Sequence, residues 1–118
     1  MDILSTGNIL RVSVFEIVGS PYCAASGDGQ KIHDRLAVAF REGYRVSLSF
    51  YNVCIVTSAF LNVAIGQLYG EFTEEQIRAA LDVSDLDIDD VALLRRVIEN
   101  AKQYFADLQN FETANQVV

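Results

Sequence analysis

Apolar and polar residues alternate in two segments of the chain, a pattern typical of half-buried β-strands. The first segment runs from about Ile9 to Val18, and the second from about Tyr44 to Tyr51. In the second segment Val46, Leu48 and Phe50 alternate with serines, so we expect one buried face and one polar face. Residues 53–56 form a short apolar continuation of that strand.

Two helices are predicted from apolar positions that recur every three or four residues. The first extends from about Gly29 to Glu42, with Asp28 as its cap and Gly43 as its stop. The second begins at Thr57-Ser58, of which either residue can be the N-cap, and reaches Tyr69.

The second half of the chain predicts a short helix, a strand and a longer helix. Residues 73–76 (Thr-Glu-Glu-Gln) form a capping box, so a brief helix should begin there and pass into a strand near residues 80–84. Apolar positions from Val91 to Leu108 lie on one face of a helix of about twenty residues. We expect the tail from about Asn110 to be frayed.

Strands that alternate with helices indicate an α/β layer architecture around a small, partly parallel sheet. No repeat or linker interrupts the 118 residues, so we expect one domain spanning residues 1–118. Half of the residues (51%) are hydrophobic, which is enough for a packed core.

Composition and charge restrict the class of partner. The net charge is −7, and the whole acidic excess lies in residues 60–118, which argues against nucleic acid and anionic membranes as partners. No apolar run approaches the roughly 20 residues of a membrane span, and the start lacks the basic region of a signal peptide. With only two cysteines, reduced thiols and a cytoplasmic location are expected. Residues 71–90 hold most of the acidic excess; they are either a solvated face or a docking face for a basic partner.

Metal and cofactor chemistry find little support in the residue spacing. Asp85, Asp87 and Asp89 copy the first three ligand positions of a calcium loop, but Asp90 and Arg96 stand where that loop needs Gly and Glu. Two cysteines and one histidine do not make a zinc pattern. The chain also lacks a glycine-rich phosphate cradle, so no metal and no cofactor are expected.

Catalytic nucleophiles are also poorly supported, so the sequence does not predict an enzyme. His33 is expected at the surface or boundary of the first helix. Cys54 lies in an apolar run and is expected in the core, whereas Cys23 lies in a loop and is expected to be accessible.

Thr57-Ser58 is the candidate functional site that both the residue types and the local helix electrostatics support. Here a strand ends in hydroxyl residues just as a helix begins. A phosphoryl group on either hydroxyl would meet free backbone N–H groups and the positive helix end. The alternative to phosphorylation is that one of these residues serves only as the N-cap of the helix.

Five segments carry a resemblance to one known family that extends over nearly the whole chain, from about Leu10 to Phe105. The most specific is the stretch Thr57-Ser58-Ala59-Phe60-Leu61-Asn62; the others are Asp28–Ile32, Val46–Phe50, Gly66–Tyr69 and Val97–Ala101. With these segments the chain resembles the STAS-like family of small bacterial proteins known as DUF4325, which is related to the anti-sigma factor antagonist (STAS) fold.

The resemblance implies a single STAS-like domain, with a small mixed sheet flanked by helices, that regulates by binding proteins rather than by catalysis. In STAS antagonists an ATPase of the histidine-kinase type phosphorylates a serine at a helix start and so toggles partner binding. Ser58 matches this serine, and Thr57 is the alternative phosphorylated hydroxyl. Thr57 and Ser49 stand where the STAS pattern has aspartates.

The expected partner-binding residues are Ser49, Asn52, Thr57, Ser58, Phe60 and Asn62. The loss of both aspartates favours an alternative, a constitutive interaction or small-ligand-binding module without phosphorylation. Whether the domain forms a homodimer is left open by the sequence, although its hydrophobic content leaves room for an interface.

Overall fold

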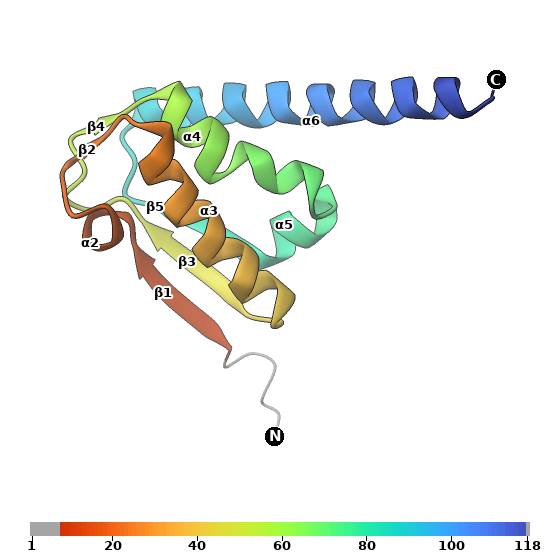
Figure 1. Cartoon of the computed structure of the whole chain (residues 1–118). Coiled ribbons are helices and arrows are strands. Elements are labelled where there is room, and N and C mark those ends of the chain that lie inside the picture. The colour runs from red at the N-terminus through yellow and green to blue at the C-terminus, as the bar shows by residue number, and fades with distance from the viewer. Residues whose placement is uncertain (1–7, 118) are drawn as a thin grey trace.

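The computed structural model describes residues 8–117, and the side chains of residues 8–111. Its strands form two small sheets (Figure 1). In the larger sheet, β3 (Arg45–Ser49) lies between β1 (Ile9–Ser13) and β5 (Leu81–Ser84). In the smaller sheet, β2 (Tyr22–Cys23) pairs with β4 (Ile55–Val56). Every one of these pairings is parallel.

Helices connect the strands and account for most of the remaining described chain. They are α2 (Val14–Val18), α3 (Ser26–Arg41), α4 (Ser58–Ala64), the 3₁₀ helix η1 (Gly66–Gly70), α5 (Glu74–Ala80) and α6 (Ile88–Val117). The α/β fold class is therefore confirmed. The resemblance implied a mixed sheet, but the strand pairs in the described part of the chain are all parallel.

The three-stranded sheet carries its helices on one face. Its strands add in one direction, β1-β3-β5, and right-handed crossovers in such an order bring both connections to the same face. Val46 and Leu48 of β3 are buried on this face, beneath α3 (Figure 1). We call the opposite side, which carries Arg11, Ser47 and Asp82, the open face.

The core lies between the sheet and the helices α3 and α4. Ile32 and Leu36 of α3 are fully buried, as are Phe60 and Leu61 of α4. Phe50, which follows β3, is also buried. This packing holds the start of α4 in a fixed position relative to α3.

The first predicted strand is half as long as expected. It ends at Ser13 because the Ser13 hydroxyl accepts a hydrogen bond from the Glu16 backbone N–H (3.1 Å) and so caps α2. Gly19 then ends α2 in the left-handed conformation (φ 78°). The alternation from Ile9 to Val18 therefore covers a strand and a helical turn.

Two further boundaries differ from the prediction. Helix α3 begins at Ser26, with Ala25 as an N-cap that makes no side-chain bond; Asp28 lies in the first turn and pairs with Lys31 (3.4 Å). The predicted helix from Thr57 to Tyr69 changes at Ile65 (φ −122°, ψ −43°) from α4 to η1. The predicted helix and strand over residues 73–84 are confirmed as α5, with its capping box, and β5.

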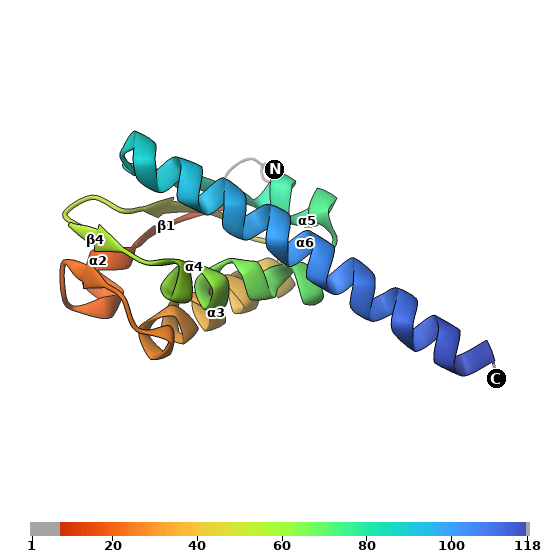
Figure 2. The same cartoon turned by 90° about the horizontal axis from the view of Figure 1, so that it is seen from above.

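Helix α6 is longer than the sequence predicts, because it continues through the expected frayed tail to Val117. Its first half packs against α4 and η1, while its second half projects beyond the body of the molecule (Figure 2). None of the helices in residues 8–117 combines the length and the apolarity needed to cross a membrane.

Candidate functional site

Four of the predicted site residues, Ser49, Asn52, Thr57 and Ser58, lie at the ends of β3 and β4 and at the start of α4. Thr57 joins β4 to α4 with extended backbone dihedrals (φ −112°, ψ 161°). Its hydroxyl accepts a hydrogen bond from the Phe60 backbone N–H (3.2 Å) and donates one to the Ala24 carbonyl (2.8 Å). Thr57 is thus the N-cap and also links this turn to the chain before α3, so its hydroxyl is already used.

Ser58 differs from its neighbour. It is the first residue of α4 and is exposed, and its hydroxyl bonds to none of the described residues. A phosphoryl group here would lie in the first turn of the helix, where negative charge is favoured. Of the two predicted hydroxyls, only that of Ser58 is free for modification without loss of a structural bond.

Ser49 lies at the end of β3 and connects two loops. Its hydroxyl donates a hydrogen bond to Asp85 Oδ2 (2.7 Å) and accepts one from the Tyr51 backbone N–H (3.1 Å). Asp85 follows β5 and has a positive φ of 67°, so its carboxylate turns back to the strand end. The sequence reasoning missed this role of Asp85; its place directly after an alternating strand was the available signal.

Asn52 occupies the turn between β3 and β4, where it is exposed. The turn is closed by a hydrogen bond from the Val53 N–H to the Phe50 carbonyl (3.0 Å). Asn52 has a φ of 70°, a conformation that asparagine tolerates better than most residues. No hydrogen bond or ion pair joins Asn52 to Ser58, the first residue of α4, among the described residues.

Phe60 and Asn62 have separate locations. The Phe60 side chain is completely buried, so the expectation that it contacts a partner is wrong for this structure; its apolar ring packs in the core because it lies on the inner face of α4. Asn62 is exposed and lines a small pocket of about 240 Å³ between α4, η1 and α6, together with Gly66 and Tyr104.

Three large apolar side chains are exposed on the smaller sheet and on the turn that leads into it. Tyr22 of β2 and Ile55 of β4 are register partners, 58% and 48% exposed. Tyr51, in the adjoining turn, is 68% exposed. Because Cys23 and Val56 are the buried partners in this sheet, Tyr22 and Ile55 share its outer face.

The two cysteines have the opposite environments to those expected. Cys23 is fully buried in β2, whereas Cys54 is exposed. Burial, and to a lesser extent the charge of Asp28, raises the pKa of the Cys23 thiol to about 11. This thiol is therefore protonated at neutral pH and is a poor nucleophile.

His33 is buried, which corrects the expected position at the surface or boundary of its helix. Its Nε2 lies 2.6 Å from a carboxylate oxygen of Glu71, and its Nδ1 lies 3.1 Å from Asp34. Arg41 pairs with the other oxygen of Glu71 (2.9 Å). These contacts tie α3 to the segment after η1, and they bring no hydroxyl or thiol within bonding distance of the imidazole in the described chain.

The acidic stretch is partly used inside the molecule. Glu71 binds His33 and Arg41, and Glu74 binds Arg78 (2.7 Å) and Lys102 (3.0 Å). The Asp87 carboxylate accepts a hydrogen bond from the Asp90 N–H (2.9 Å) at the start of α6, as expected for an aspartate-rich helix start. Within the described residues no group of three or more potential metal ligands is present.

These features define a small α/β domain in which parallel strands lead into polar loops and helix starts. Residues 28–91, from the first turn of α3 to the start of α6, match the family described as the STAS-like domain of unknown function (DUF4325). The chain therefore belongs to this family, as the sequence motifs predicted. The match is shorter than the expected extent from Leu10 to Phe105, and the Val97–Ala101 motif lies outside it. No curated protein and no solved structure matches the chain.

Proposed function

We propose that this chain is a regulatory protein-binding module whose partner docks on the outer face of the smaller sheet and the start of α4. We call this the docking surface, and it consists of Tyr22, Tyr51, Ile55 and Ser58. The observation that supports it is the exposure of three large apolar side chains on the smaller sheet and its adjoining turn, since β4 of this sheet leads through Thr57 into Ser58, the residue of the Thr57-Ser58 pair whose hydroxyl is unbonded among the described residues. Exposed aromatic residues of this kind are enriched at protein interfaces.

Phosphorylation of Ser58 gives this docking surface a switch. A phosphate would add about two negative charges, which the positive end of α4 tolerates. The same charge on the docking surface would have to be desolvated when a partner binds, and so would weaken docking. This proposal draws on the resemblance to STAS antagonists. By that resemblance, the phosphorylating partner is an ATPase of the histidine-kinase type, and both proteins act in a bacterial cytoplasm.

Photo-crosslinking in the source organism tests the docking surface. With p-benzoylphenylalanine in place of Tyr22, we expect a discrete adduct with one protein, identified by mass spectrometry. The same group in place of Gln103, which is exposed on α6, should give no such adduct. Ser58→Asp should reduce the adduct at least several-fold, since it puts negative charge at the helix start. Equal adducts from both positions would contradict the docking surface.

Phosphate mapping of the protein purified from that organism separates the switch from the alternative. Phosphate on Ser58 supports the switch. A discrete adduct at residue 22 together with unmodified Ser58 and Thr57 would support a constitutive interaction module, which is the alternative that the missing aspartates favour.

A homodimer is a second candidate assembly, and one stripe of α6 favours it. Tyr104, Leu108 and Phe111 are 60%, 39% and 63% exposed. Their spacing continues that of the buried Leu94 and Val97 on the same helix. A stripe with alternating three- and four-residue spacing fits one further helix, and a second copy of α6 presents the same stripe.

A further inference from the structure

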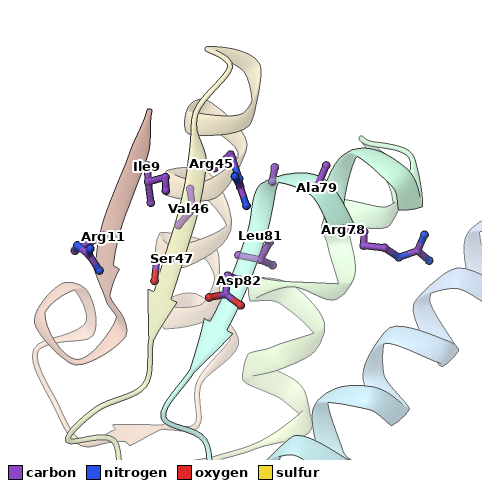
Figure 3. Close-up of a pocket in the computed structure, with 10 residues that line it drawn as sticks. Ile9, Arg11, Arg45, Val46, Ser47, Arg78, Ala79, Leu81 and Asp82 are labelled. Carbon is purple, nitrogen blue, oxygen red and sulfur yellow. The ribbon is translucent and has the colours of Figure 1, made fainter. Parts of the chain in front are cut away.

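The open face of the three-stranded sheet contains a pocket of about 350 Å³ (Figure 3). One row of side chains crosses it, because Arg11 of β1 is the register partner of Ser47 of β3, and Ser47 is the partner of Asp82 of β5. Arg45 is two residues before Ser47 on β3 and lines the same pocket. Two guanidinium groups, a hydroxyl and a carboxylate therefore share one surface.

The character of these side chains shows what kind of occupant the open face suits. Parallel sheets are normally covered on both faces by apolar contacts. Here the open face continues past Ser47 with three serines, Ser13, Ser49 and Ser84. Ile9, the register partner of Arg45, is an apolar side chain at the other end of the same face. With arginines, serines and Asp82 around it, this surface fits a hydrophilic ligand better than a further apolar layer.

The positions of the cations favour an anion. Arg11 and Arg45 lie on adjacent strands, one two-residue step apart, so their Cα atoms are separated by roughly 8 Å. Their side chains lie on opposite sides of β3 (Figure 3), but both are exposed, and rotation about their side-chain bonds would bring the two guanidinium groups together over that distance. Neither forms an ion pair with a carboxylate of the described residues. Arg78, also at the pocket rim, points away toward α6 (Figure 3) and is paired with Glu74 (2.7 Å).

We propose that the open face binds a small phosphate monoester that also carries an ammonium or hydroxyl donor. Arg11 and Arg45 hold the phosphate, because two guanidinium forks match its oxygens and its charge of about −2. Ser47 lies between the two ends of the ligand. Asp82, at the opposite end of the row from Arg11, accepts a hydrogen bond from the ammonium or hydroxyl group of the ligand.

This site is separate from the docking surface. The docking surface belongs to β2, β4, the turn between β3 and β4, and the start of α4, whereas the phosphate site uses β1, β3, β5 and the end of α5. The ligand proposal therefore does not depend on the phosphorylation of Ser58, and we expect a substitution in one site to leave binding at the other unchanged.

A nuclear magnetic resonance titration of the ¹⁵N-labelled protein tests the site. The probes are O-phosphoserine, inorganic phosphate and serine, each at the same ionic strength of about 0.1 M. We expect saturable amide shifts over residues 9–11, 45–47 and 82 with O-phosphoserine, weaker binding of inorganic phosphate, and none of serine. Absence of saturation up to about 20 mM, where even a millimolar site would fill, would overturn the proposal.

Matched variants identify the groups that bind. Arg11→Gln and Arg45→Gln should each weaken O-phosphoserine binding about tenfold or more, as expected for a lost charged hydrogen bond. Asp82→Asn should remove the preference for O-phosphoserine over inorganic phosphate. Arg35→Gln makes the same charge change on the exposed side of α3 and should leave binding unchanged. Equal losses in Arg35→Gln and Arg11→Gln would show unspecific attraction and reject the site.

Discussion

Gly29 of α3 lies against the backbone carbonyl of Phe60 in α4, so closely that a Cβ atom at residue 29 would be 2.6 Å from that oxygen. The two helices approach this near only because residue 29 has no side chain. Since Phe60 is two residues after Ser58, the contact also fixes the start of α4. Position 29 therefore links the packing of the core to the docking surface.

Gly29→Ala should destabilise the protein by about 1–3 kcal/mol, the usual cost of inserting a methyl group into a packed contact. Denaturant unfolding measures this change. Gly27→Ala is the matched control in the same helix, because a Cβ there meets nothing within 4 Å; it should be neutral or slightly stabilising. Equal losses in both variants would contradict the close contact.

Thr57→Ala should cost about 1–2 kcal/mol in unfolding free energy, because it removes the cap of α4 and the bond to Ala24. Ser58→Ala should change stability by less than about 0.5 kcal/mol, since its hydroxyl is exposed and unbonded. The same unfolding experiment compares the two. A larger effect at Ser58 than at Thr57 would reverse the assignment of the cap.

The two thiols should react at very different rates with a disulfide reagent such as dithionitrobenzoate. Cys54 is exposed and should react quickly, while Cys23 is buried, with a pKa raised to about 11, and should react only on unfolding. Cys54→Ser should abolish the rapid reaction and Cys23→Ser should leave it intact. Rapid loss of both thiols in the native protein would argue against the burial of Cys23.

The Glu74–Lys102 contact between α5 and α6 should make stability depend on pH. The hydrogen bond from Lys102 is the main reason that the pKa of Glu74 is lowered. Because the pKa of Glu74 is lower in the folded state, its ionised carboxylate stabilises the fold. This stabilisation is complete above the pKa of the unfolded chain and is lost as the pH falls through the pKa of the folded protein. The stability difference between the protein and Lys102→Met should thus shrink in acid. Glu75→Gln, which removes a carboxylate on the exposed side of α5 and leaves the Glu74–Lys102 contact in place, is the control: the acid-dependent difference should persist when Lys102→Met is compared within that background.

If α6 pairs with a second copy, Leu108→Lys should shift the protein from dimer toward monomer in sedimentation velocity runs, because it places a charge in the apolar stripe. Asn110→Lys adds the same charge at an exposed position off that stripe and should leave the assembly unchanged. A protein that is monomeric at all concentrations would exclude the dimer.

Local sequence patterns were sufficient to predict the secondary structure of much of the chain. Thr73 and Gln76 predicted the start of α5, which forms both bonds of a capping box, because such a motif involves only neighbouring residues. The strand over Arg45–Ser49 was predicted by its alternation. The prediction of the first strand was wrong after Ser13, where α2 begins. A period of two over five residues does not distinguish a strand from a strand followed by a helical turn.

Environment was harder to predict than secondary structure. Cys54 was assigned to the core from its apolar neighbours, and Cys23 to an accessible loop, yet their burial is reversed. The pairing of β2 with β4 decides which side of each strand faces the core, and a two-residue strand is too short to carry a periodic signal. His33 was misplaced for a similar reason, since its partner Glu71 lies 38 residues away.

The sequence alone determined the family, the α/β class, the helix start at Thr57-Ser58 and the acidic second half, because these depend on local motifs, periodicity and composition. The tertiary structure decided which of the two hydroxyls is free, since the bond that occupies Thr57 comes from Ala24, 33 residues earlier in the chain. It also decided that Phe60 is buried and that Arg11, Ser47 and Asp82 share one face. Contacts of this kind follow from strand register and helix packing, which no local pattern encodes.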